Sequence, residues 1–138
     1  MGAEDNLRSL VDACEDPNLV SVAYDAKKGA EYFKILTEKA LLAFINTGML
    51  EDPKYINTRP WELNPHKPPD IMVEAFSFYS GKKYGYIAFM FIPKMQKWRI
   101  KSFKKNRDQD PRQLKTALLH SPFAGLRLEK LEAPLKEK

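Results

Sequence analysis

Cysteine and histidine are scarce in this chain of 138 residues, which contains one cysteine, Cys14, and two histidines, His66 and His120. A single thiol excludes an intramolecular disulfide and a cysteine-rich zinc site, because both need several thiolates. The low cysteine content is typical of a reducing compartment, so we expect a cytoplasmic protein. We expect Cys14 to be a small buried apolar residue rather than a nucleophile.

Long apolar runs are also absent. The longest, residues 87–92, has the length of a strand and is far shorter than the ~20 apolar residues that a membrane helix needs. The first ten residues carry charges and no long apolar stretch, so they do not have the pattern of a signal peptide. These absences predict a protein without a membrane partner.

The signatures of several enzyme classes are missing. The chain contains no phosphate-binding glycine loop, no dinucleotide fingerprint and no His-Glu-x-x-His motif. No carboxylate cluster suggests a magnesium site, so the sequence predicts neither a metal nor a cofactor. His66 lies among prolines, where we expect a surface histidine, with a catalytic or ligand role as the alternative.

Charge is present but unevenly distributed. The net charge is +5, and residues 1–25 contain six acids and one base. Residues 94–107 contain no acid and seven bases: Lys94, Lys97, Arg99, Lys101, Lys104, Lys105 and Arg107. A block of this kind attracts a polyanion or an acidic partner. The alternative is a solvated strand face that only aids solubility.

Three strands joined by short connections are predicted in the middle of the chain, at residues 71–79, 84–92 and 97–103. Short connections make neighbouring strands antiparallel, so the three form a meander. In the last strand Trp98 and Ile100 alternate with three basic residues. We therefore expect a sheet with one core face and one basic face.

Helices are predicted on both sides of this meander. Apolar spacing favours a short helix at 5–14 and a long helix at 26–47, which ends before Gly48. The long helix should cover the core face through Phe33, Leu36, Leu41 and Phe44. Further expected elements are a short strand at 19–24, a helix from Asp110-Pro111 to His120, a last strand at 125–131 and a frayed tail at 132–138.

A long segment, residues 49–70, contains five prolines. Proline lacks a backbone donor and fixes its φ torsion, so we expect a loop, with Trp61 attaching it to the body of the protein. The complete prediction is one α+β domain spanning residues 1–138. Its three- to four-stranded antiparallel meander is covered on one face by the long helix, and a short C-terminal helix follows.

The basic strand and its neighbour suggest RNA as a partner. Cations such as Lys97, Arg99 and Lys101 neutralise phosphates, and aromatic rings such as Tyr84 and Tyr86 stack on unpaired bases. The same residue types can cleave RNA without a metal, through a base, an acid and a cation that stabilises the phosphorane. The alternative is that both tyrosines only pack across strands.

A helix, a long loop and a meander that closes on Trp98-Arg99-Ile100-Lys101-Ser102-Phe103-Lys104 resemble the small RelE-superfamily toxins, especially the MqsR-like branch of mRNA interferases. The resemblance covers about residues 31–105. It implies a metal-independent endoribonuclease of a toxin–antitoxin system, with Tyr86 and Lys104 as catalytic residues and Arg99 or Lys101 stabilising the developing charge. Residues expected to contact RNA or the ribosome are Lys97, Lys101, Lys105, Arg107 and Tyr84.

A non-enzymatic interaction domain is the second interpretation. Such a domain, for example a toxin-neutralising or immunity protein, would bind an acidic protein partner. It would use the same basic strand or the proline-rich segment around Trp61.

Overall fold

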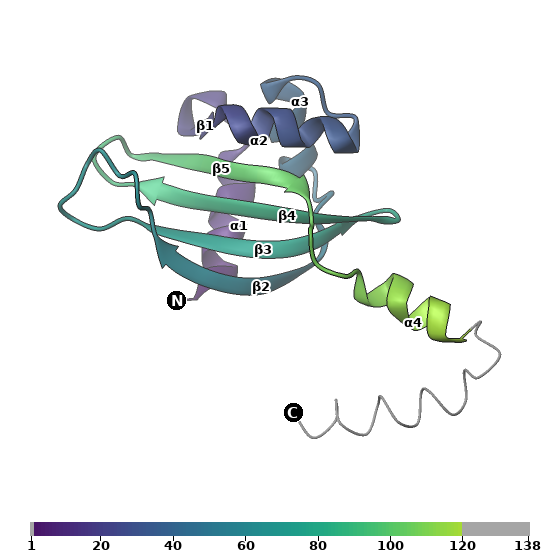
Figure 1. Ribbon diagram of the computed structural model, residues 1–138. Helices are drawn as coiled ribbons and strands as arrows, with labels where there is room; N and C mark the ends of the chain where they lie inside the picture. Colours follow the sequence, from purple (N-terminus) through teal and green to yellow (C-terminus); the bar gives the residue numbers. More distant parts are fainter. Residues whose placement is uncertain (1, 120–138) are drawn as a thin grey trace. The chain divides into compact units, whose positions relative to one another are not determined.

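The computed structural model describes residues 2–119. The chain divides into two compact units, Met1–Asn106 and Arg107–Lys138. The elements, labelled in Figure 1, are α1 (Ala3–Ala13), β1 (Val20–Val22), α2 (Tyr24–Gly29), α3 (Glu38–Asn46), β2 (Glu51–Pro60), β3 (Met72–Ser80), β4 (Lys83–Ile92), β5 (Lys97–Lys105) and α4 (Pro111–Leu119). Among the described residues, no helix has the length and apolar character needed to span a membrane.

The first unit is built on a five-stranded sheet in the order β1-β5-β4-β3-β2. Strands β2 to β5 form an antiparallel meander, whereas β1 pairs with β5 in parallel, with Val20 opposite Trp98. The α+β class and the three central strands are therefore confirmed. The sheet is larger than predicted and mixed, because β2 is added beside β3 in antiparallel and β1 beside β5 in parallel.

The added strand β2 corrects the prediction of a loop over residues 49–70. Proline is tolerated on an edge strand, where one side of the backbone makes no ladder hydrogen bonds. β2 is an edge strand; Pro60 is its last residue, and Pro53 falls in a register shift between Glu51 and Lys54. Only residues 61–71 form the connection to β3. The Trp61 N–H donates to the carbonyl of Ile71 (2.8 Å) and joins the two ends of this connection, while the Trp61 side chain packs against a buried cluster of the sheet.

The predicted helix over residues 26–47 is divided into three pieces. After α2 the chain forms a 3₁₀ helix, Ala30–Phe33, which ends at Lys34 in the left-handed conformation (φ 63°). Helix α3 then starts afresh, because the Thr37 hydroxyl accepts a hydrogen bond from the Ala40 N–H (3.0 Å). Leu36 lies in this break and is 73% exposed, so its predicted place in the core is wrong.

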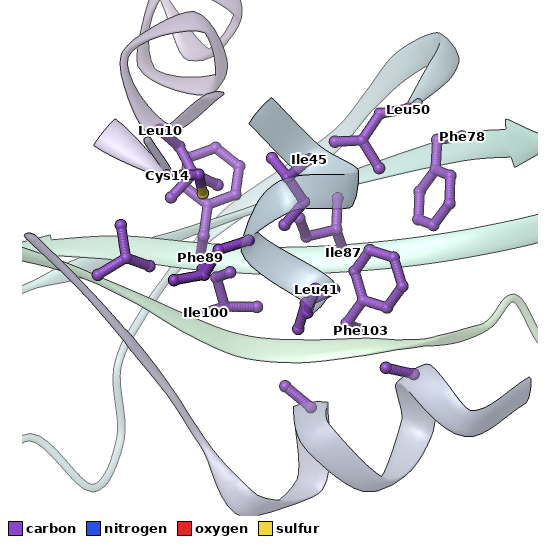
Figure 2. Close-up of a cluster of buried hydrophobic side chains, with 14 of the residues drawn as sticks. Leu10, Cys14, Leu41, Ile45, Leu50, Phe78, Ile87, Phe89, Ile100 and Phe103 are labelled. Atoms are coloured by element: carbon purple, nitrogen blue, oxygen red, sulfur yellow. The ribbon is translucent and has the colours of Figure 1, made fainter. Parts of the chain in front are cut away.

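One face of the sheet packs against α1, α2 and α3 and contains the main hydrophobic core (Figure 2). The core side chains are contributed by the sheet (Phe76, Phe78, Ile87, Phe89, Ile100 and Phe103) and by the helices and their connections (Leu7, Leu10, Cys14, Ala26, Ala30, Phe33, Ile35, Leu41, Leu42 and Ile45), with Val20 and Leu50 beside them. Phe44 and Trp98 are partly buried against it. Burial of Cys14, as expected, raises its pKa to about 12 because the charged thiolate would lose its hydration.

Helix α2 lies very close to β5 because its last residue is Gly29. A Cβ atom at this position would overlap the carbonyl oxygen of Phe103 and approach the Cβ of Lys104 to 2.8 Å. The absence of a side chain therefore sets the distance between α2 and β5, which carries five of the seven basic residues of the block 94–107.

In the second unit, α4 begins as predicted. The Asp110 carboxylate accepts the N–H of Arg112 (2.9 Å), and Pro111 occupies the first helical position. The strand expected at 125–131 and the tail expected at 132–138 lie outside the described residues.

Candidate functional site

The face of the sheet opposite α1, α2 and α3 carries a group of cationic side chains, Arg59, Lys97, Arg99, Lys101 and Lys104, together with Lys54 opposite Ser77 on β3. We call it the basic face. Its apolar centre is a second, smaller cluster of buried residues: Ile71, Val73, Ala75, Ala88, Met90 and Ile92. Trp61 and Tyr86 pack against this cluster and are only partly buried. The face thus combines cations, aromatic rings and small apolar residues.

A β-bulge in β5 decides which basic residues share this face. Ile100 is paired with Phe89 and Ser102 with Ala88, so Lys101 is an extra residue in the ladder. Regular alternation from Arg99 would direct Phe103 toward the basic face and Lys104 toward the helices. The bulge reverses this: Phe103 lies in the main core, and Lys104 joins Arg99 on the basic face.

Tyr86 and Lys104 are brought together by this register. They are direct partners across β4 and β5, and the Lys104 Nζ lies 5.3 Å from the centre of the Tyr86 ring. This is a cation–π contact between two half-buried side chains. The pair that the family resemblance implies therefore occupies one place on the surface.

Arg99 lies further along the same strands. It is paired with Met90, four residues from Tyr86, which corresponds to about 13 Å along a strand. Its Nη1 donates to the Ser21 hydroxyl on β1 (3.3 Å). Lys101, in contrast, lines a surface groove of the basic face together with Tyr86. Lys104 lies over the tyrosine ring, and of Lys101 and Arg99 it is Lys101 that shares the groove with the tyrosine.

The remaining predicted residues do not line a groove with Tyr86 and Lys101. Lys97 is half-buried opposite Ile92, and Tyr84 packs on Tyr79 with ring centres 5.0 Å apart. Lys105 lies over the Tyr32 ring (5.7 Å), away from the Lys104 side chain because successive strand residues face opposite ways. Arg107 is exposed and belongs to the second unit. His66 is half-buried, and its backbone N–H donates to the Asn64 side chain (2.7 Å).

A groove of about 260 Å³ crosses the basic face. Its floor follows a row of directly paired residues from strand to strand, in which Asn57 faces Ala75, Ala75 faces Ala88, and Ala88 faces Ser102. The two adjacent alanines have short side chains and are each 2% exposed, with Trp61 and Tyr86 packed against the cluster that contains them. The groove is also lined by larger side chains, among them the two aromatic residues Trp61 and Tyr86 and the two cations Arg59 and Lys101.

Asn57 and Arg59 are site residues that sequence reasoning missed. Both lie on β2, which was predicted as a loop because residues 49–70 contain five prolines. A signal was present, because Asn57, Arg59 and Trp61 recur at every second position, as residues on one face of a strand do.

In the described part of the chain, the cation of the basic face that takes part in an ion pair is Lys54, whose Nζ lies 3.7 Å from the Asp52 carboxylate. None of the ion pairs formed within residues 2–119 involves Arg59, Lys97, Arg99, Lys101 or Lys104. Glu62 is the acid among the residues that line the groove. The arrangement therefore concentrates positive charge around a shallow aromatic groove, which suits a ligand with both phosphate and ring groups.

Comparisons with protein-family models, with curated proteins and with solved structures find no match for this chain.

Proposed function

We propose that this protein binds single-stranded RNA through the basic face. The observation that carries the proposal is that Lys97, Arg99, Lys101 and Lys104 lie on one side of β5, the last of them because of the bulge at Lys101. Cations without acidic partners attract the phosphate backbone, and binding releases the condensed counterions.

Partly exposed aromatic rings favour a single strand over a duplex. Tyr86 and Trp61 pack on the apolar centre of the basic face but keep part of their surface in solvent. Proteins that bind single strands combine such stacking platforms with a positively charged track, because every unpaired base has a ring face to stack. In a duplex these ring faces are already stacked on neighbouring bases.

Metal-independent RNA cleavage is the second candidate function, and the contact between Tyr86 and Lys104 favours it. In this reaction a base removes the ribose 2′-hydroxyl proton, and the 2′-oxygen attacks phosphorus. The 5′-oxygen leaves with a proton supplied by an acid, which produces a 2′,3′-cyclic phosphate and a 5′-hydroxyl end. Lys101 would stabilise the charge that develops on the phosphorane. The resemblance to RelE-superfamily toxins leads to the same pair of residues.

The test of binding is a fluorescence-anisotropy titration of a short labelled single-stranded RNA at several salt concentrations. We expect tight binding at low salt that weakens steeply as salt rises. The triple variant Lys97→Ala, Arg99→Ala, Lys101→Ala should bind more weakly. It should also lower the slope of log K against log salt by roughly 2, or about 0.7 for each lost phosphate contact.

A matched control removes the same charge from the helix-covered side. The triple variant Lys27→Ala, Lys28→Ala, Lys39→Ala changes three exposed lysines on α2 and α3 and should bind RNA as the unchanged protein does. If both triple variants lose affinity equally, the attraction is a general charge effect and the basic face is not the site. No binding at low salt would contradict the proposal and favour an acidic protein partner.

A further inference from the structure

We infer that the groove on the basic face holds one unstacked nucleobase, with the adjoining phosphate on Arg59 and Lys101. This inference rests on the proposed function and deepens it, because it makes one nucleotide of the RNA a specifically bound unit. The evidence is the combination of groove shape, aromatic lining and placement of polar groups.

The shape follows from side-chain size along three neighbouring rows of the sheet. The middle row, with Ala75 opposite Ala88, rises little above the backbone, while Tyr86 stands in the row on one side. Trp61 closes the groove where the chain leaves β2. The result is a shallow slot over two small residues that is lined by two aromatic side chains, Tyr86 and Trp61.

The size fits a single nucleoside. A volume of about 260 Å³ lies just below the ~300–1,000 Å³ of pockets that hold drug-sized ligands. A dinucleotide cofactor would exceed it, whereas a base with its ribose is compact enough. Flat rings also match the lining, because unpaired bases in RNA complexes stack on aromatic side chains.

The polar groups lie where a nucleotide needs them. Asn57, half-buried at the β2 end of the row, carries an amide that can both donate and accept hydrogen bonds with a base edge. Arg59 and Lys101 are both exposed and line the groove from opposite sides of the sheet meander, β2 and β5. A phosphate on either side of the base would therefore meet a cation.

The experiment uses the intrinsic fluorescence of Trp61. The chain has two tryptophans, so the variant Trp98→Phe leaves Trp61 as the single reporter while keeping an aromatic ring at position 98. This variant is titrated with each of the four nucleoside 5′-monophosphates and with ribose 5-phosphate. We expect saturable quenching by at least one nucleotide and none by ribose 5-phosphate, which has the phosphate but no base.

Two substitutions of Trp61 distinguish ring stacking on the base from simple apolar contact. In the RNA titration, Trp61→Leu keeps an apolar side chain but loses the flat ring, and should weaken binding roughly 5- to 100-fold. Trp61→Phe should restore most of the affinity. Asn57→Ala should reduce the difference in affinity between RNAs that differ in one base. Lys39→Ala on α3 is the control, and it should change neither the RNA affinity nor this difference.

The outcomes distinguish this inference from the proposed function. Salt-dependent RNA binding that survives Trp61→Leu, with no quenching by any nucleotide, would overturn the base-binding groove and leave RNA binding intact. Quenching by nucleotides without binding of any RNA would support the groove and identify a free nucleotide as its ligand. Equal quenching by ribose 5-phosphate and nucleotides would show that only phosphate is bound, which contradicts the inference.

Discussion

Lys104 faces Tyr86 across two paired strands, with the lysine nitrogen 5.3 Å from the centre of the phenol ring. The two residues are 18 positions apart in the sequence, and their contact depends on one extra residue, Lys101, in β5. The bulge directs Phe103 into the core and Lys104 toward the tyrosine. Bulges next to functional sites commonly re-aim a side chain in this way.

We predict that the purified protein cleaves mRNA, free or on translating ribosomes, in the presence of EDTA and leaves 2′,3′-cyclic phosphate ends. Tyr86→Phe and Lys104→Ala should each lower the cleavage rate by roughly 10²–10⁴-fold, as loss of a general acid or base does. Arg99→Ala should have a smaller effect than Lys101→Ala, because Lys101 shares the groove with Tyr86. The measurement is gel electrophoresis with end-group analysis, and circular dichroism checks that each variant is folded. Intact RNA in both settings would remove the cleavage function and leave the binding function to be judged separately.

The corrected boundary between α2 and α3 predicts a contrast between two leucines. Leu41 is 1% exposed in the main core and Leu36 is 73% exposed in the break. Leu41→Ala should lower the free energy of unfolding by about 2–5 kcal/mol, whereas Leu36→Ala should change it by less than about 0.5 kcal/mol. Urea denaturation measures both. Similar losses for the two variants would mean that one continuous helix packs on the sheet.

A methyl group at Gly29 should separate α2 from β5. The new Cβ would overlap the Phe103 carbonyl, so we expect Gly29→Ala to destabilise the protein by about 1–3 kcal/mol, as overpacking does. Gly2→Ala is the matched control, because a Cβ at Gly2 meets nothing within 4 Å. A thermal-shift assay that gave the same melting temperature for both variants would show that the close approach of α2 is absent.

Cys14 should make stability fall at high pH. Burial raises its pKa from 9.0 to about 12 in the folded protein, so between these values only the unfolded chain releases the thiol proton. The stabilising contribution is complete below pH 9 and is lost as pH rises toward 12, by up to about 1.4 kcal/mol per pH unit. Lysines and tyrosines titrate in the same range, so the measurement is the difference in urea-unfolding free energy between the protein and Cys14→Ala. A difference that does not vary between pH 8 and 10.5 would contradict the buried thiol.

Local patterns in the sequence determined the central strands, α1, the start of α4 and the burial of Cys14. Strands β3, β4 and β5 are separated by short connections that contain turn residues, so their antiparallel pairing follows from the connections alone. The concentration of cations in residues 94–107 is equally a property of the sequence. These features depend on neighbours in the chain, which is why they can be predicted without a structure.

Tertiary contacts decided the remaining features. Residues 26–47 have helical apolar spacing throughout, yet the chain turns at Lys34; α2 then packs against β5 through Gly29, and α3 supplies Leu41 to the main core. Residues 51–60 contain prolines that argue against a strand, yet hydrogen bonds to β3 make them an edge strand and bring Asn57 and Arg59 to the groove. The side on which Lys104 lies depends on a bulge, because a single extra residue reverses every later side chain of a strand. The positions of Phe103 in the core and Lys104 beside Tyr86 are therefore decided by packing across the sheet, which no local pattern contains.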